Sequence, residues 1–216
     1  MKTAVIISGG SLNENFALAF LKETKPEILI GADKGICFLK GNNLKPTHIV
    51  GDFDSAAESA LSYFRQFPEI PIRQFQPIKD LTDTQIALEL AIELTAERIY
   101  ILGFSGTRLD HVMANIRILA IALQKGVETY LLDEHNRIRL SNAPVRIKKD
   151  EQYGKYVSLF AFGETVKGIS LKGFYYLLTK YDMKAGDSIG VSNEITAEIG
   201  EIFFDSGRLL VMESKD

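Results

Sequence analysis

The strongest constraint on the fold is an alternation along residues 1 to about 135, where short apolar, β-branched runs are separated by segments of helical period. A strand–helix–strand order brings successive strands parallel, so this alternation favours an α/β domain with a mainly parallel sheet. The predicted strands are residues 4–7, 27–32, 47–51, 72–75, 98–103 and 128–133.

Capping signals predict where two of the intervening helices begin. Ser11 and Glu14 have the spacing of a capping box and open the apolar segment SLNENFALAFLKE. Thr82 and Gln85 repeat that spacing, so a helix is expected from about Asp83. A further helix is expected over residues 110–125.

The pattern changes after about residue 136 to brief alternating strands separated by glycines and charged turns. Such spacing is typical of an antiparallel sandwich or barrel. We therefore predict a Rossmann-like α/β domain over residues 1–137 and an all-β antiparallel sandwich domain over residues 138–216. The candidate strands of the second domain are YVSLFAF, GISLKGF, DSIGV, EIFF and RLLVM.

Composition excludes several kinds of partner. The 25 basic and 28 acidic residues give a formal net charge of −3, which offers no broad attraction for nucleic acid or an anionic membrane. No apolar run is long enough to span a bilayer, and the apolar run near the start is too short for a secretory signal. Cys37 is the only cysteine, which fits a reducing compartment. We expect a soluble cytoplasmic protein.

Two acids follow the third predicted strand in the segment GDFDS, residues 51–55. If the extended backbone persists through residue 54, Asp52 and Asp54 project to one face while Phe53 points into apolar packing. That arrangement suits two carboxylates that converge on one divalent ion.

Other strand ends carry polar groups as well. Asp33 closes the second strand, Asp80 and Asp83 follow the fourth, and Arg108 and Asp110 follow the fifth. Open parallel sheets bind ligands beyond the carboxyl ends of their strands, so these groups are expected at one edge. The alternative for any single Asp is a turn or helix cap, for which Asp is a common residue.

Carboxylates gathered in one crevice repel each other, so their ionised forms need a compensating cation. Oxygen ligands select a hard ion such as Mg²⁺, which prefers a few carboxylates together with waters and phosphate oxygens. The acids therefore predict a phosphate-bearing substrate.

Two further segments carry candidate phosphate ligands. Gly9 and Gly10 at the first strand end allow close backbone approach to a phosphate, or form a plain tight turn. Arg108 offers a planar bidentate donor, or else pairs with Asp110 at the surface. His111 is a candidate ligand, acid or core histidine.

Together these motifs resemble the thiamine pyrophosphokinase family, especially its bacterial branch. The resemblance covers nearly the whole chain, in the order GADKG, GDFDS, KDLTD, GTRLDHVMANI and GFYYLLTKYDMKAGDSIGVSNE. It implies transfer of the diphosphoryl group of ATP to the hydroxyl of thiamine, which gives thiamine diphosphate and AMP, with Mg²⁺ as cofactor. It also implies a homodimer with active sites at the subunit interface.

The resemblance implies roles for individual residues of the first domain. The implied catalytic acids are Asp52, Asp54, Asp80 and Asp83, of which Asp52, Asp54 and Asp83 would hold the metal. On the nucleotide side, the resemblance and the strand-end analysis together give Gly9, Gly10, Asp33, Thr82, Arg108, Asp110, His111 and Asn115. One carboxylate of the cluster is expected to accept the hydroxyl proton, and the sequence does not say which.

In the second domain the segment SNE matches the family's thiamine-side motif, so Ser192 and Asn193 are expected to bond the aminopyrimidine. Tyr176 occupies the family's aromatic position, where its ring either stacks on the pyrimidine or packs at an interface. Bacterial relatives usually have proline next, and this chain has Leu177, so we expect a less constrained loop.

Two alternatives compete with this interpretation. DFDS also resembles the nucleophile motif of haloacid-dehalogenase-like phosphatases, although it lies at the third strand and ends in Ser55. A nucleotide-binding regulatory module without catalysis is the other alternative, since a fold does not establish a reaction.

Overall fold

The computed structural model describes residues 1–53, 57–74 and 81–216. It divides into two compact units, Met1–Glu134 and His135–Asp216. The boundary predicted after residue 137 falls within the first strand of the second unit. Among the described residues, no helix combines the length and apolarity that crossing a membrane requires.

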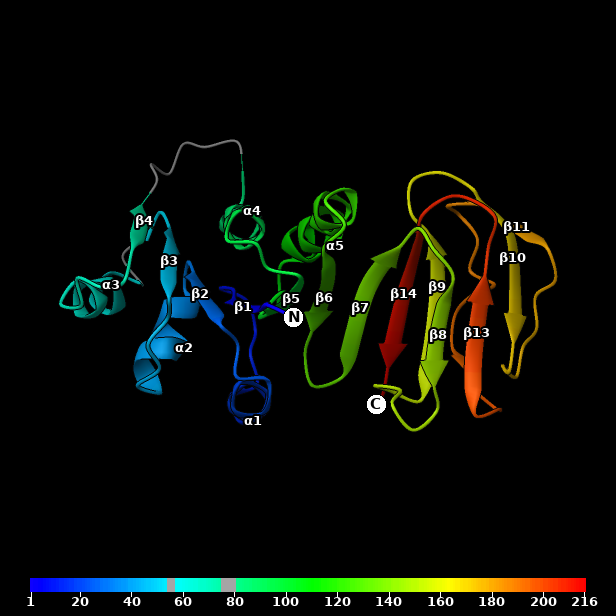
Figure 1. Ribbon diagram of the computed structural model, residues 1–216, viewed down its shortest axis with the longest axis horizontal. Helices are drawn as coiled ribbons and strands as arrows, with labels where there is room; N and C mark the ends of the chain where they lie inside the picture. Colours follow the sequence, from blue (N-terminus) through cyan, green and yellow to red (C-terminus); the bar gives the residue numbers. More distant parts are fainter. Residues whose placement is uncertain (54–56, 75–80) are drawn as a thin grey trace. The chain divides into compact units, whose positions relative to one another are not determined.

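The first unit is an α/β layer structure around a parallel sheet (Figure 1). Its strands are β1 (Thr3–Ile7), β2 (Ile28–Ala32), β3 (His48–Gly51), β4 (Ile72–Gln74), β5 (Arg98–Leu102) and β6 (Glu128–Leu132). They lie in the order β6-β5-β1-β2-β3-β4, and neighbouring strands are parallel. The predicted parallel α/β sheet is confirmed.

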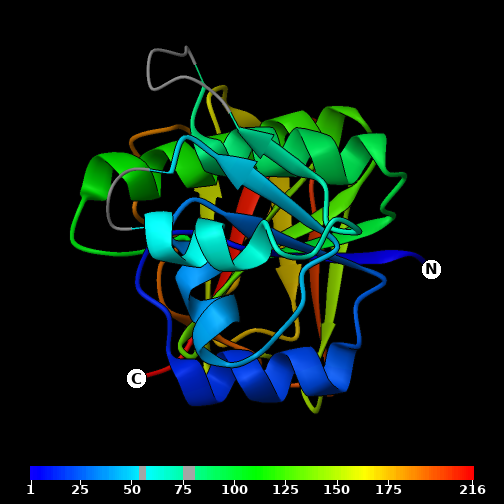
Figure 2. The same cartoon turned by 90° about the vertical axis from the view of Figure 1, so that its left-hand side faces the viewer.

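Five helices cover this sheet in the described part of the unit: α1 (Glu14–Thr24), α2 (Gly35–Gly41), α3 (Glu58–Phe64), α4 (Asp83–Glu93) and α5 (Leu109–Gln124). The first three pack their buried residues into one core with β1, β2 and β3. α4 and α5 lie side by side on the opposite face (Figures 1 and 2). Because both faces are covered, β1 and β2 are almost wholly buried, as their continuous apolar sequences require.

The strand order reverses at β1, which lies between β2 and β5. The chain moves outward from β1 through β4 and then returns to the other side of β1. At such a point the loops after the two neighbouring strands run in opposite directions and leave a crevice. The loops that follow β1 and β5 therefore form the expected position for a ligand.

The two capping predictions had different outcomes. Thr82 caps α4, because its hydroxyl accepts the backbone N–H of Gln85 at 3.2 Å. The capping residue predicted for α1, Ser11, was wrong: Asn13 is the N-cap of this helix, and its side chain accepts the N–H of Phe16 at 3.1 Å. Ser11 is instead part of the preceding loop, where its N–H donates to the Ser105 carbonyl at 2.7 Å.

The second unit consists of two antiparallel sheets, as predicted for this part of the chain. One has the order β12-β9-β14-β7 and the other β11-β10-β13-β8. Their inward-facing apolar side chains form one core. The strands are β7 (Asn136–Ser141), β8 (Val145–Lys148), β9 (Tyr156–Ala161), β10 (Val166–Lys172), β11 (Tyr181–Met183), β12 (Asn193–Glu194), β13 (Ile199–Phe203) and β14 (Leu209–Ser214).

The strand predicted from DSIGV, residues 187–191, is wrong, since this segment forms turns. Asp187 accepts the N–H of Lys184 at 2.8 Å and the hydroxyl of Tyr181 at 2.9 Å. This local bonding by an Asp side chain stabilises a turn in place of a strand. Ile189 and Val191 remain exposed as a result.

Candidate active site

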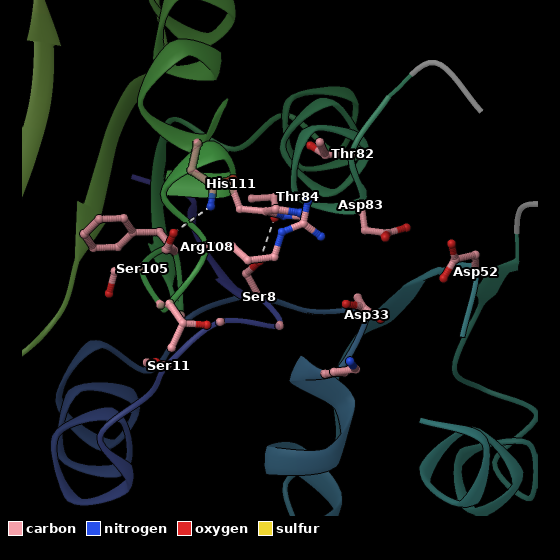
Figure 3. A pocket seen from close by; sticks show the side chains of 18 residues that line it. Ser8, Ser11, Asp33, Asp52, Thr82, Asp83, Thr84, Ser105, Arg108 and His111 are labelled. Carbon is pink, nitrogen blue, oxygen red and sulfur yellow. Dashed lines mark hydrogen bonds between the residues drawn. The ribbon is translucent and has the colours of Figure 1, made fainter. Parts of the chain in front are cut away.

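A pocket of about 700 Å³ opens at the carboxyl ends of the parallel strands (Figure 3). The residues after β1 form one wall and those after β5 form another. The two loops are joined by backbone bonds from Gly10 to the Gly103 carbonyl at 2.9 Å and from Ser11 to the Ser105 carbonyl at 2.7 Å. The pocket therefore lies where the strand order predicts a ligand.

Three carboxylates meet on one side of this pocket. Asp33 follows β2, Asp52 follows β3, and Asp83 is the first residue of α4. Each offers an oxygen that lies within 4.8 Å of the other two, and all three side chains are half-buried. Figure 3 shows them directed toward a common space. These three acids thus lie together, as expected from their positions near the strand ends.

The backbone at two strand ends has an unusual conformation. Asp33 has a φ of 49°, and its N–H donates to the Val50 carbonyl at 3.0 Å. Phe53 has a φ of 54° and is buried in the core of the α1–α3 face. Non-glycine residues rarely adopt the left-handed region, and those that do concentrate at functional sites. Asp33 belongs to the acid cluster, and Phe53 directly follows its member Asp52.

The left-handed Phe53 overturns one step of the sequence argument. β3 ends at Gly51 and Phe53 is left-handed, so the extended backbone that the argument required is broken at Phe53. The predicted burial of Phe53 in apolar packing is confirmed. Asp54 and Asp80, two of the predicted catalytic acids, lie outside the described residues.

Hydroxyl groups line much of the remaining pocket surface. Ser8, directly after β1, and Thr84, in the first turn of α4, are both buried and share a hydrogen bond of 2.6 Å (Figure 3). Thr82 also lines the pocket while it caps α4. The other lining hydroxyls belong to Ser11, Ser105 and Thr107.

Side chains with N–H donors reach the pocket from two segments of the chain. Lys34 follows Asp33, and Arg108 and His111 lie at the start of α5. The guanidinium of Arg108 forms a fork with Asp110, with contacts of 3.2 Å and 2.6 Å. Because a guanidinium has five N–H donors and this fork uses two, donors remain for a ligand.

Arg108 and Asp110 also set each other's ionisation. The hydrogen bond from Arg108 lowers the pKa of the Asp110 carboxyl, and the same bond raises the pKa of Arg108. Asp110 additionally accepts the N–H of His111 at 3.0 Å. Both members of the pair are exposed, and Asp110 is not among the residues that line the pocket. The surface pair considered from sequence is therefore present.

The predicted residues Gly9, Gly10 and Asn115 line the pocket, and Gly10 and Asn115 also hold its walls in place. A Cβ on Gly10 would lie 2.2 Å from the Ser105 carbonyl oxygen, so only glycine allows the two loops to approach this closely. Asn115 is buried and donates to the Phe104 carbonyl at 2.7 Å. The start of α1 is not among the residues that line the pocket.

In the second unit the predicted thiamine-side residues lie on neighbouring segments. Tyr176 is 62% exposed and its ring meets that of Tyr175 edge to face, with centroids 4.9 Å apart. Asn193 is buried and bonds the backbone of Tyr176. Ser192 is exposed, with a φ of 57°.

Comparison with known proteins identifies the family. Residues 21–131 match the family described as "Thiamin pyrophosphokinase, catalytic domain", and residues 144–209 match "Thiamin pyrophosphokinase, vitamin B1 binding domain". Thiamine pyrophosphokinase of Bacillus subtilis (strain 168) is 31% identical over 217 residues, which cover 100% of both chains. The chain belongs to the thiamine pyrophosphokinase family.

Solved structures of this family share the fold. A thiamine pyrophosphokinase structure from Bacillus subtilis has a TM-score of 0.88 at 30% identity and covers 100% of both chains. One from Geobacillus thermodenitrificans has a TM-score of 0.84 at 29% identity, with 99% of this chain and 98% of that chain covered. The expected family resemblance is thus confirmed.

Membership of this family makes the chain an enzyme of thiamine diphosphate synthesis from thiamine. This assignment replaces the two alternatives considered from the sequence, a phosphatase and a regulatory module without catalysis. His111 is exposed at the pocket, which removes the core-histidine alternative as well.

Several pocket residues of this thiamine pyrophosphokinase family member were not predicted from the sequence: Ser8, Ser11, Lys34, Thr84 and Ser105. Ser8 directly follows β1, so the strand-end rule that found Asp33 and Asp52 was sufficient to find it. Lys34 lies inside the GADKG motif. For Ser105 and Thr84 the sequence carries no specific signal, because Ser and Thr are ordinary residues of loops and first helical turns.

Proposed function

We propose that this enzyme transfers the diphosphoryl group of ATP to the hydroxyl of thiamine, with release of AMP. In that reaction the thiamine oxygen forms a bond to the β-phosphorus. The bond from that phosphorus to the α,β-bridging oxygen breaks, and the hydroxyl proton passes to a base. One of the clustered carboxylates would accept it.

The convergence of Asp33, Asp52 and Asp83 carries this proposal. Three carboxylates with oxygens within 4.8 Å of one another repel unless a cation or protons lie between them. An all-oxygen donor set at a pocket wall fits Mg²⁺, and a bound magnesium ion would neutralise charge on the phosphate oxygens. Asp54 and Asp80 are proposed as further members of the acid group, on the family resemblance alone.

The same pocket also offers the groups that a polyphosphate requires. Arg108, Lys34 and His111 supply N–H donors, and the first two are positively charged at neutral pH. The hydroxyls of Ser11, Ser105 and Thr107 supply further donors. We assign the nucleotide to this pocket, with its phosphates between the acid cluster and Arg108.

For thiamine, the proposal assigns Tyr176 as the stacking surface and Ser192 as a hydrogen-bonding group of the second unit. An exposed tyrosine ring presents a flat face, and stacking of this kind contributes about 0.5–1.5 kcal/mol beyond area burial. The match of residues 144–209 to a vitamin B1 binding domain supports this assignment.

The deciding experiment combines purified protein, ATP, Mg²⁺ and thiamine and measures the nucleotide product. Diphosphoryl transfer predicts AMP and thiamine diphosphate in equal amounts. Accumulation of ADP with thiamine monophosphate would contradict it. Omission of thiamine is the control, because AMP release without the acceptor would indicate hydrolysis in place of transfer.

We further propose a cytoplasmic homodimer with its active sites at the subunit interface. An interface is supported by three consecutive exposed residues of the second unit, Tyr175, Tyr176 and Leu177, since monomers rarely leave contiguous apolar patches uncovered. Light scattering should give twice the chain mass of 24.1 kDa, and a monomer at working concentration would contradict the dimer. Cell fractionation tests the compartment.

A further inference from the structure

The side chain of Asn193 bonds both backbone groups of one residue. Its Oδ1 accepts the N–H of Tyr176 at 2.9 Å, and its Nδ2 donates to the Tyr176 carbonyl at 2.7 Å. A primary amide offers a carbonyl and an N–H in one plane, as a peptide group does. Asn193 therefore acts toward Tyr176 as a neighbouring strand would.

This contact continues a short backbone ladder. Phe174 forms a bridge with Ile195, and the N–H of Tyr175 donates to the Glu194 carbonyl at 2.9 Å. The next pair along the ladder would involve Tyr176, and there the Asn193 side chain takes the place of a main-chain partner. Both backbone groups of Tyr176 are thereby fixed, together with the direction in which its Cα–Cβ bond leaves the chain.

The residues around Tyr176 provide little other restraint. Tyr176 is 62% exposed, and Leu177 beside it is 65% exposed. Leucine leaves φ free to vary, whereas a proline at position 177 would fix it. The hydrogen bonds from Asn193 are consequently the main restraint that the described contacts place on the backbone of Tyr176.

The hydrogen-bonding capacity of Asn193 is almost fully used. Its Oδ1 also accepts the N–H of Glu194 at 2.9 Å, so both lone pairs of that oxygen have donors. The residue is only 6% exposed. Ser192 differs: it is exposed, and in the described part of the chain only its backbone N–H has a partner, the Ser158 hydroxyl at 3.0 Å. Of the two residues, Ser192 is the one that presents a side chain to a ligand.

We infer that Asn193 is a positioning residue for thiamine: it holds the Tyr176 ring in place through the backbone and makes no direct hydrogen bond to the aminopyrimidine. This inference rests on the proposed role of Tyr176 as the stacking surface. It reverses the expectation, drawn from the family motif, that Ser192 and Asn193 both contact the substrate.

A double-mutant cycle on the KM for thiamine tests the inference. Asn193→Ala and Tyr176→Ala should each raise that KM about tenfold or more, as expected for loss of one ordered contact, with the KM for ATP little changed. The double variant should be no worse than Tyr176→Ala alone, because Asn193 acts only through Tyr176. Additive effects, or a normal KM in Asn193→Ala, would overturn the inference.

Ser192→Ala is the matched control. Because Ser192 is proposed to contact thiamine directly and independently of the ring, the effect of Ser192→Ala on the thiamine KM should add to that of Tyr176→Ala. Asn193→Asp provides a second variant of the same shape. It keeps the two acceptor bonds but places a carboxylate oxygen against the Tyr176 carbonyl, so it should also raise the KM for thiamine.

A wild-type measurement covers the case in which the Asn193 variants do not fold. A crystal structure with thiamine bound should show the Asn193 amide still on the backbone of Tyr176. An amide turned onto the pyrimidine would overturn the inference. Failure of the proposed stacking role gives a different result, since Tyr176→Ala alone would then leave the KM for thiamine unchanged.

Discussion

The hydroxyl oxygens of Ser8 and Thr84 lie 2.6 Å apart in a buried hydrogen bond that joins the end of β1 to the first turn of α4. Thr84 follows Asp83, so the same bond fixes the helix start that carries one acid of the cluster. A contact between two parts of the chain 76 residues apart thus helps to build the proposed metal site.

Thr84→Val should destabilise the protein by about 1–3 kcal/mol, because it leaves the Ser8 hydroxyl buried without its partner. Ser8→Ala should have a similar effect. The double variant should lose less than the sum of the two, since neither unpaired hydroxyl then remains. Urea unfolding of the four proteins checks this, and strictly additive losses would show that the two hydroxyls do not interact.

Gly9 provides a test of the position of Asp33. A Cβ at Gly9 would lie 2.7 Å from the Oδ2 atom of Asp33, so Gly9→Ala should push that carboxylate out of the cluster. A displacement of about 1 Å in a catalytic group can lower the reaction rate about a hundredfold. We therefore expect Gly9→Ala to lower the rate by about that factor while the protein still folds.

Gly41→Ala is the control for Gly9→Ala. Gly41 ends α2, and a Cβ there would meet no atom within 4 Å. Its alanine variant should keep normal activity and stability, because alanine is the better helix former. Equal activity in both alanine variants would contradict the proposed role of Asp33.

The pH dependence of stability should show the effect of His48. Burial lowers the pKa of His48 below 6.5, and the charge of Arg73 lowers it further. Between the lowered value and 6.5 the unfolded chain binds more protons than the folded protein, so stability should fall as the pH falls through this interval. His48→Gln should flatten the part of the profile that lies below about pH 6.5. An unchanged profile would contradict the assignment.

The parallel sheet was predictable because its strands are buried on both faces and appear in the sequence as continuous apolar runs. α2 and α3 were missed for a local reason. Each has seven residues, and their N-cap positions, Lys34 and Ala57, make no side-chain capping bond. Short helices of this kind depend on tertiary packing, which sequence period does not reveal.

The acid cluster was predictable because the carboxyl ends of parallel strands share one edge. Its detailed geometry was not, since Phe53, next to Asp52, has a left-handed conformation that sequence rules assign to glycine and asparagine. The role inferred for Asn193 could not be predicted from the sequence either. A motif shows which residues recur together but not whether a side chain contacts substrate or backbone.

We propose that Asp33, Asp52 and Asp83 together bind a divalent cation that the reaction requires. The most direct test measures AMP formation as a function of Mg²⁺ concentration for the wild type and for Asp33→Asn, Asp52→Asn and Asp83→Asn. Glu69→Gln is the control, since it removes an exposed carboxylate whose described partner is Lys45. We expect no turnover without Mg²⁺, a loss of about 10²-fold or more in each Asn variant and normal turnover in the control. Magnesium-independent turnover, or near-normal turnover in all three Asn variants, would contradict it.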